Sequence, residues 1–152
     1  ISPLAHSEPN YAYIIIRAVA VQEKMDQPHW ILIHKVGSIR DTHYPASGPI
    51  LRVRAGTHRI YHIDFSRDRT SSLGTFHFSD PFELNVEAGK IYIFGTLELS
   101  NDTRRAMDFS IDIDFDLLRA ACEAEPDILE SLPVVNIHTG TEFKVSCADE
   151  KD

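Results

Sequence analysis

The chain has 152 residues, 43% of them hydrophobic and 25% charged, a composition typical of one folded domain rather than of a disordered or membrane-spanning chain. Its formal net charge is -8 and its pI is near 5.4, which argues against nucleic-acid partners, because nucleic-acid-binding domains carry a basic face. Its longest apolar runs are no longer than a strand, so the sequence predicts no transmembrane segment.

Residues 11–145 are expected to form a single β-sandwich domain. Residues 1–10 contain two prolines and no periodicity, which predicts an extended lead-in or tether. Residues 146–152 read as a polar tail. Within the domain, residues 11–21 and 29–36 are rich in β-branched and aromatic residues and predict the first two strands.

Residues 37–49 have the glycine, proline, serine and aspartate content of a loop. This loop includes His43 and Tyr44, and an exposed loop with aromatic residues suits contacts with a partner. Loop aromatics also often cover the core of their own domain. The sequence therefore marks both residues as candidate partner contacts and leaves the second interpretation open.

An Ala-Gly motif occurs twice in similar surroundings. In the first copy, Leu51 and Val53 precede Ala55 and Gly56, and strand-spaced apolar residues follow. In the second, residues 84–89 repeat the spacing and residues 90–99 form the next strand. Glycine takes the positive φ that a tight turn needs, so each copy predicts a β-hairpin. Two copies are fewer than a solenoid requires.

The C-terminal third begins with a strict alternation of apolar and acidic residues over 107–116, which predicts a strand with one buried and one solvated face. Asp116 is the expected N-cap of a helix of roughly nine residues, and Pro126 begins a further helical turn. Residues 134–137 and 142–145 could add an edge strand. The predicted fold is mainly all-β: an Ig-like or prealbumin-like antiparallel β-sandwich with one short C-terminal helix.

Histidines are the most abundant reactive side chains, and His34, His62, Asp64 and His77 are the candidate metal ligands if cross-strand pairing brings them together. His58 and His62 would stand one turn apart on a helix, but on a strand they share a face about 13 Å apart, too far for one ion. Ordinary polar residues on a solvated face are the favoured interpretation. The sequence thus predicts no metal and no cofactor.

No pattern for catalysis is present. The chain has no G-x-S-x-G elbow, P-loop or dinucleotide fingerprint. The aspartates of the 107–116 strand lack the glycines of a calcium loop, and a solvated strand offers Asp112 or Asp114 no reason to shift its pKa for acid or base work. We therefore expect no catalytic residues and no enzyme.

Cys122 and Cys147 are the two cysteines, and they lack C-x-x-C spacing. An even count suits one disulfide in an exported protein. Two unrelated buried thiols in a cytosolic protein are the alternative, which the sequence leaves open.

The two Ala-Gly segments resemble those of small bacterial envelope domains of the prealbumin-like or PEGA-like kind, especially lipoprotein families of unknown function. Residues 53–56 with His58 and Ile60 match the first family segment, and residues 86–92 match the second, within a likeness over residues 11–99. The resemblance implies a β-sandwich exported to the periplasm or cell surface, with a lipid anchor on a cysteine upstream of Ile1. The acidic strand and helix depart from the pattern.

These observations predict a non-enzymatic exported envelope or surface domain that binds another protein or an envelope polymer through its loops and an exposed sheet face. The alternative is a small-ligand or metal-binding module.

Overall fold

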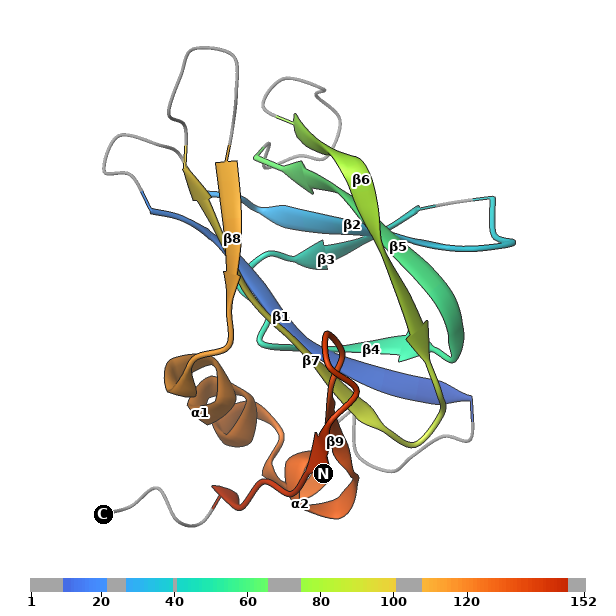
Figure 1. Ribbon diagram of the computed structural model, residues 1–152, viewed down its shortest axis with the longest axis vertical. Coiled ribbons are helices and arrows are strands. Elements are labelled where there is room, and N and C mark those ends of the chain that lie inside the picture. Colours follow the sequence, from blue (N-terminus) through green and yellow to red (C-terminus); the bar gives the residue numbers. More distant parts are fainter. Residues whose placement is uncertain (1–9, 22–26, 40, 66–74, 101–107, 148–152) are drawn as a thin grey trace.

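The computed structural model describes residues 10–21, 27–39, 41–65, 75–100 and 108–147 as two β-sheets with two short helices (Figure 1). The four-stranded sheet has the order β3-β2-β5-β6. The six-stranded sheet has the order β10-β9-β7-β1-β4, with β8 also paired to β7. The strands are β1 (Tyr11–Ala20), β2 (Trp30–Lys35), β3 (Asp41–Pro45), β4 (Ile50–Arg54), β5 (Gly56–Asp64), β6 (Thr75–Val86), β7 (Ile91–Ser100), β8 (Asp108–Asp112), β9 (Val134–Asn136) and β10 (Glu142–Phe143).

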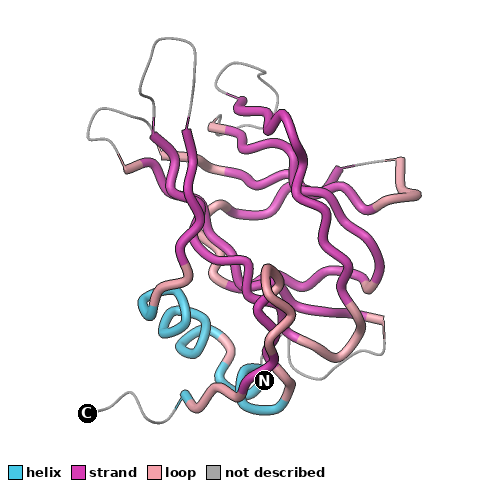
Figure 2. Tube along the Cα trace, viewed as in Figure 1, coloured by secondary structure: helices cyan, strands magenta, loops and turns pink. Residues whose placement is uncertain are grey.

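The prediction of a mainly β fold is confirmed, but two of its details are wrong. The six-stranded sheet is mixed, because β7 runs parallel to both β1 and β9. The described chain also has two helices where one was expected: α1 (Phe115–Ala124) and α2 (Pro126–Ser131). Figure 2 shows both helices on one side of the strands, beside the C-terminal segment.

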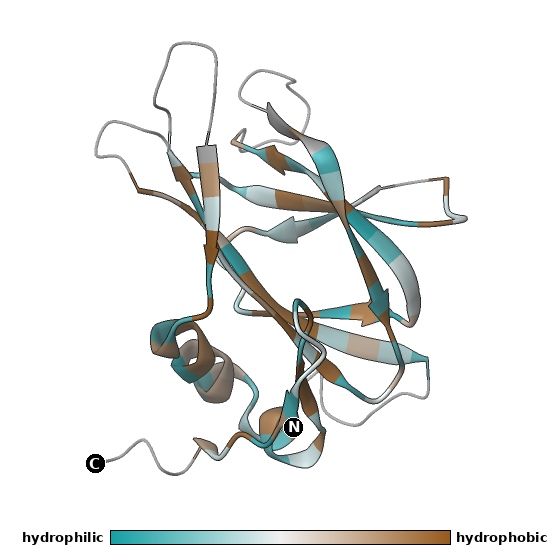
Figure 3. Cartoon of the chain, in the orientation of Figure 1, coloured by the Kyte–Doolittle hydropathy of each residue, from teal (hydrophilic) through white to brown (hydrophobic). Residues whose placement is uncertain are grey.

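The central strand β1 of the mixed sheet is buried on both faces, which explains its continuous apolar run. Ile14 and Ile16 face the core between the sheets, whereas Tyr13 and Ile15 face a second core formed with α1 and α2. Strands in parallel pairs are usually covered on both faces and read as unbroken apolar runs. Figure 3 shows this as a brown stretch along the middle of β1.

The Ala-Gly motifs are not hairpins, as the sequence predicted, but passages between the sheets. β4 belongs to the six-stranded sheet and β5 to the four-stranded one; β6 and β7 make the reverse passage. Gly56 and Gly89 have the expected positive φ, 136° and 81°. Both turns hydrogen-bond to the start of β1: the Ala55 amide donates to the Asn10 carbonyl and the Gly89 amide to that of Tyr11. The repeat therefore reflects two turns on either side of one central strand.

The acidic strand ends earlier than predicted. β8 stops at Asp112, and Asp114, not Asp116, is the N-cap of α1, its Oδ1 accepting the Leu117 amide at 2.8 Å. Asp114 Oδ2 also lies 3.5 Å from the Arg17 guanidinium. Phe115, expected on the strand, begins the helix and is 81% exposed.

The C-terminal segment is fixed to α1 by a disulfide between Cys122 and Cys147, whose Cα atoms lie 5.4 Å apart. Of the predicted lead-in and tail, only Asn10, Ser146 and Cys147 lie within the described residues. Neither described helix has the length and apolar character needed to cross a bilayer.

Candidate functional site

The outer face of the four-stranded sheet carries a group of rings. Ile31 and Ile33 of β2 point into the core, so Trp30 and His34 point to the other face. His43 lies opposite Leu32 on β3 and shares that face. Tyr61 and His62 of β5 complete the group. We call these five residues the ring face: Trp30, His34, His43, Tyr61 and His62.

A β-bulge at Tyr61 places two neighbouring rings on the same face. The pairing of β5 with β2 shifts there, from Leu32 with His62 to Ile33 with Ile60. Ile60 and Ile63 are both fully buried in the core, and the extra residue between them leaves Tyr61 and His62 outside. Their ring centroids lie 4.1 Å apart, and the His34 ring lies 6.4 Å from Tyr61.

Cross-strand register orders this face into rows. His43, Leu32, His62 and His77 are paired in sequence across all four strands. A second row places Asp64 opposite Trp30, and Trp30 contacts His43 edge-on at 6.2 Å between centroids. Neighbouring strands lie about 4.8 Å apart, so each row is a closely spaced line of side chains.

The structure brings three of the predicted metal candidates, His34, His62 and Asp64, to one face of the four-stranded sheet. His62 and His77 are opposite each other in register, although the side chain of His77 lies outside the described part. Asp64 is buried, and His34 contacts Tyr61. Among the described residues, no three His, Cys, Asp or Glu side chains are close enough to hold an ion. The metal-binding alternative stays a prediction.

His58 and His62 lie on opposite faces of the four-stranded sheet, whereas the sequence predicted that they share a face. The bulge lies between them, and His58 pairs with Leu84 of the core. His58 is 4% exposed, and its Nε2–H donates to the Arg54 carbonyl at 2.6 Å. Burial lowers the pKa of His58, and the nearby positive charge of Lys35 lowers it further.

The predicted loop pair His43 and Tyr44 lies on an edge strand, β3, not in a loop. Since neighbours on a strand point to opposite faces, His43 joins the ring face and Tyr44 points between the sheets. The Tyr44 hydroxyl donates to the Arg52 carbonyl at 3.5 Å. Burial raises the pKa of Tyr44.

Tyr44 lines a cavity of about 280 Å³ between β3 and β4, the edge strands of the two sheets. We call it the edge cavity. Its cationic lining is Lys35, Arg52 and Arg54, with His58 beside them. Nothing in the sequence analysis singled out these cations; the only signal was the alternation of arginine with apolar residues through Arg52 and Arg54.

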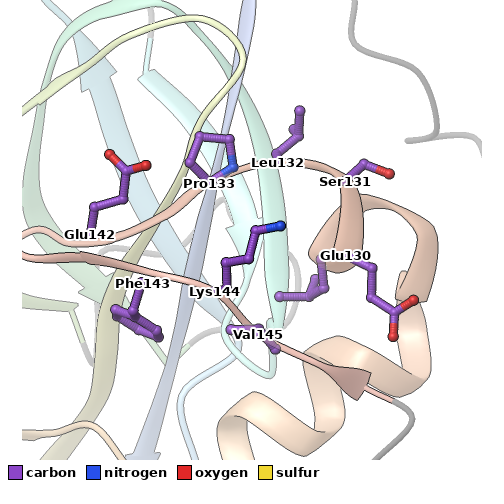
Figure 4. Close-up of a pocket in the computed structure, with 9 residues that line it drawn as sticks. Glu130, Ser131, Leu132, Pro133, Glu142, Phe143, Lys144 and Val145 are labelled. Carbon is purple, nitrogen blue, oxygen red and sulfur yellow. The ribbon is translucent and has the colours of Figure 1, made fainter.

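A second hollow, of about 440 Å³, lies between the α2–β9 segment and β10. Figure 4 shows Lys144 extending toward Leu132 and Pro133, while the Phe143 ring points to the other side of its strand. Its outer wall is held by the disulfide and by the Cys147 amide, which donates to Glu130 at 2.9 Å. We call this hollow the C-terminal groove, and its polar lining residues are Glu130, Ser131, Glu142 and Lys144.

No family model, curated protein or solved structure matches this chain.

Proposed function

We propose that this chain is a non-enzymatic, exported binding domain that holds an envelope polysaccharide against its ring face. The observation that supports this most is the gathering of five ring side chains on one side of a single sheet, while the alternate isoleucines of the same strands fill the core. All five of these side chains are half-buried and lie on the face of the sheet opposite the core.

The chemistry of the ring face suits a neutral, hydroxyl-rich polymer. Trp and Tyr rings offer flat apolar surfaces for the C–H faces of sugars, and imidazole nitrogens donate and accept hydrogen bonds from hydroxyls. Beside the rings, Arg59 pairs with Glu83 at 3.6 Å, so these two charges offset each other.

The cell compartment of the proposal is the periplasm or cell surface. The Cys122–Cys147 disulfide supports it, because structural disulfides persist in oxidising compartments and are rare in the cytosol. An exported binding domain would meet envelope polymers there.

Fluorescence of Trp30, the single tryptophan of the chain, tests the proposal. The protein is titrated with a panel of soluble uncharged polysaccharides and N-acetylhexosamine oligomers. At least one of these ligands should change the Trp30 emission, and the change should saturate as the ligand concentration rises. Tyr61→Ala should weaken the binding of that ligand about tenfold, which is the loss expected when an aromatic contact at the centre of an interface is truncated.

Phe115→Ala is the matched control, because Phe115 is an exposed aromatic on the helical side of the molecule. It should bind as the wild type does. The proposal fails if no member of the panel gives a saturable change, if Tyr61→Ala and His62→Ala both keep full affinity, or if light scattering shows that the ring face joins two copies of the chain.

A further inference from the structure

The edge cavity gathers positive charge in an acidic protein. The chain has 23 acidic and 15 basic residues, yet three basic residues line this one cavity: Lys35, Arg52 and Arg54. Among the described lining residues none is acidic. A cavity lined by one sign of charge between low-dielectric walls concentrates ions of the opposite sign.

These three cations also lack acidic partners within the described ranges. Other basic residues have them: Arg17 pairs with Asp114, Lys90 with Glu87, and Arg119 with Asp116. Lys35, Arg52 and Arg54 form no ion pair with a described carboxylate.

Two of the cations are held in place by an aromatic ring. The Arg52 guanidinium lies 4.6 Å from the centroid of the Tyr11 ring, and that of Arg54 lies 5.4 Å from it. Arg52 and Arg54 are alternate residues of β4, so they share one face of the strand. Stacked guanidinium groups lose less freedom when they bind, and their planar donors match a carboxylate or phosphate.

Lys35 and hydroxyl donors approach from the other sheet. Lys35 ends β2, and Ser38, Thr42 and Tyr44 line the cavity from the segment that follows it. The Arg52 charge acts on the Tyr44 hydroxyl and lowers its pKa against the larger effect of burial. Residues of both sheets therefore line one volume.

We propose that the edge cavity is an anion-binding site that takes a phosphate or carboxylate group between Lys35, Arg52 and Arg54. The site lies at the edge strands β3 and β4, away from the ring face, and it does not depend on the polysaccharide proposal.

Calorimetric titration of the whole chain with inorganic phosphate and, separately, with succinate tests this site. Ionic strength is held constant with sodium chloride, so that general screening is the same at every point of the titration. A saturable heat with either anion is expected, and comparison of the two identifies the preferred group. Arg54→Gln and Lys35→Gln should each weaken binding about tenfold, whereas Arg54→Lys should keep more affinity than Arg54→Gln.

Arg119→Gln is the control, since Arg119 lies on α1 and pairs with Asp116. It should bind as the wild type does. If neither anion gives a saturable heat, or if Arg54→Gln and Lys35→Gln bind like Arg119→Gln, the site is wrong. Circular dichroism establishes that each variant is folded, and Arg54→Lys provides the charge-conserving test if Arg54→Gln does not fold.

Discussion

The extra residue at Tyr61 decides which side chains β5 presents to solvent. Without the bulge, period-two alternation would place Tyr61 and His62 on opposite faces, and His58 on the same face as His62. With it, His58 lies inside and two rings lie outside. A bulge of this kind leaves no clear signal in the local sequence, because it depends on the pairing with β2 and β6.

His58→Gln should reduce the loss of stability at acid pH. The pKa of His58 is lowered in the folded chain, whereas the unfolded side chain keeps its usual value of 6.5. Below pH 6.5 the unfolded chain therefore binds a proton that the folded chain refuses, and the free energy of unfolding falls by at most about 1.4 kcal/mol per pH unit.

Glutamine can donate to the same Arg54 carbonyl but does not titrate. Urea unfolding of wild type and His58→Gln at pH 7.5 and at pH 5.5 measures the difference. Between pH 7.5 and pH 5.5 the free energy of unfolding should fall less for His58→Gln than for the wild type. Parallel losses in the two proteins would show that His58 takes up its proton equally in both states.

Gly48→Ala should destabilise the fold by more than about 3 kcal/mol. Gly48 has φ 62°, and a Cβ there would overlap the Ile16 carbonyl oxygen of the central strand. Gly140→Ala is the control: its φ is 78°, but no atom lies within 4 Å of the added Cβ. Gly140→Ala should lower the free energy of unfolding by about 1 kcal/mol. Equal melting temperatures for the two variants would contradict the predicted overlap.

At the scale of elements, β1 organises the molecule. It pairs with β4 on one side and β7 on the other, and both Ala-Gly turns bond to its first residues. Its apolar run was readable as a strand from composition. Its parallel partner begins about eighty residues later in the chain, and no local pattern reports that pairing.

Asp114 connects this strand to α1, and its variants test the corrected N-cap. Asp114→Ala should lower the free energy of unfolding by about 1 kcal/mol, because the Leu117 amide loses its acceptor. Asp114→Asn keeps an acceptor and loses only the partly exposed pair with Arg17, so it should cost less.

Asp116→Asn is the control, since Asp116 lies within the first turn and not at the cap. Its side chain is 77% exposed, and the change should stay within about 0.5 kcal/mol. Denaturant titration of the three variants ranks them. If Asp116→Asn lost more stability than Asp114→Ala, the N-cap would be Asp116, as the sequence predicted.

At the scale of the whole molecule, the sequence predicted those features that depend on interactions between residues close together in the chain. Strand-forming runs and the positive φ of Gly56 and Gly89 were readable, because side-chain period and turn chemistry act over a few residues. The sheet that each strand joins was not readable. The same turn residues serve a hairpin and a passage between sheets, so both Ala-Gly motifs were assigned wrongly.

The candidate sites were only partly readable for the same reason. His34, His43 and His62 were noticed from the sequence by type, and the register of three strands then placed them on one face with Trp30 and Tyr61. The edge cavity combines Lys35 of one sheet with Arg52 and Arg54 of the other. A site assembled from two sheets has no contiguous motif.

Two-dimensional amide NMR of the chain with the tightest-binding polysaccharide from the fluorescence panel tests the central claim most directly. We predict that the shifted amides cluster on β2, β3 and β5 around Trp30, His43 and Tyr61. The amides of the C-terminal groove should not move. Shifts centred on β10 and α2, with the ring-face amides unmoved, would contradict the account.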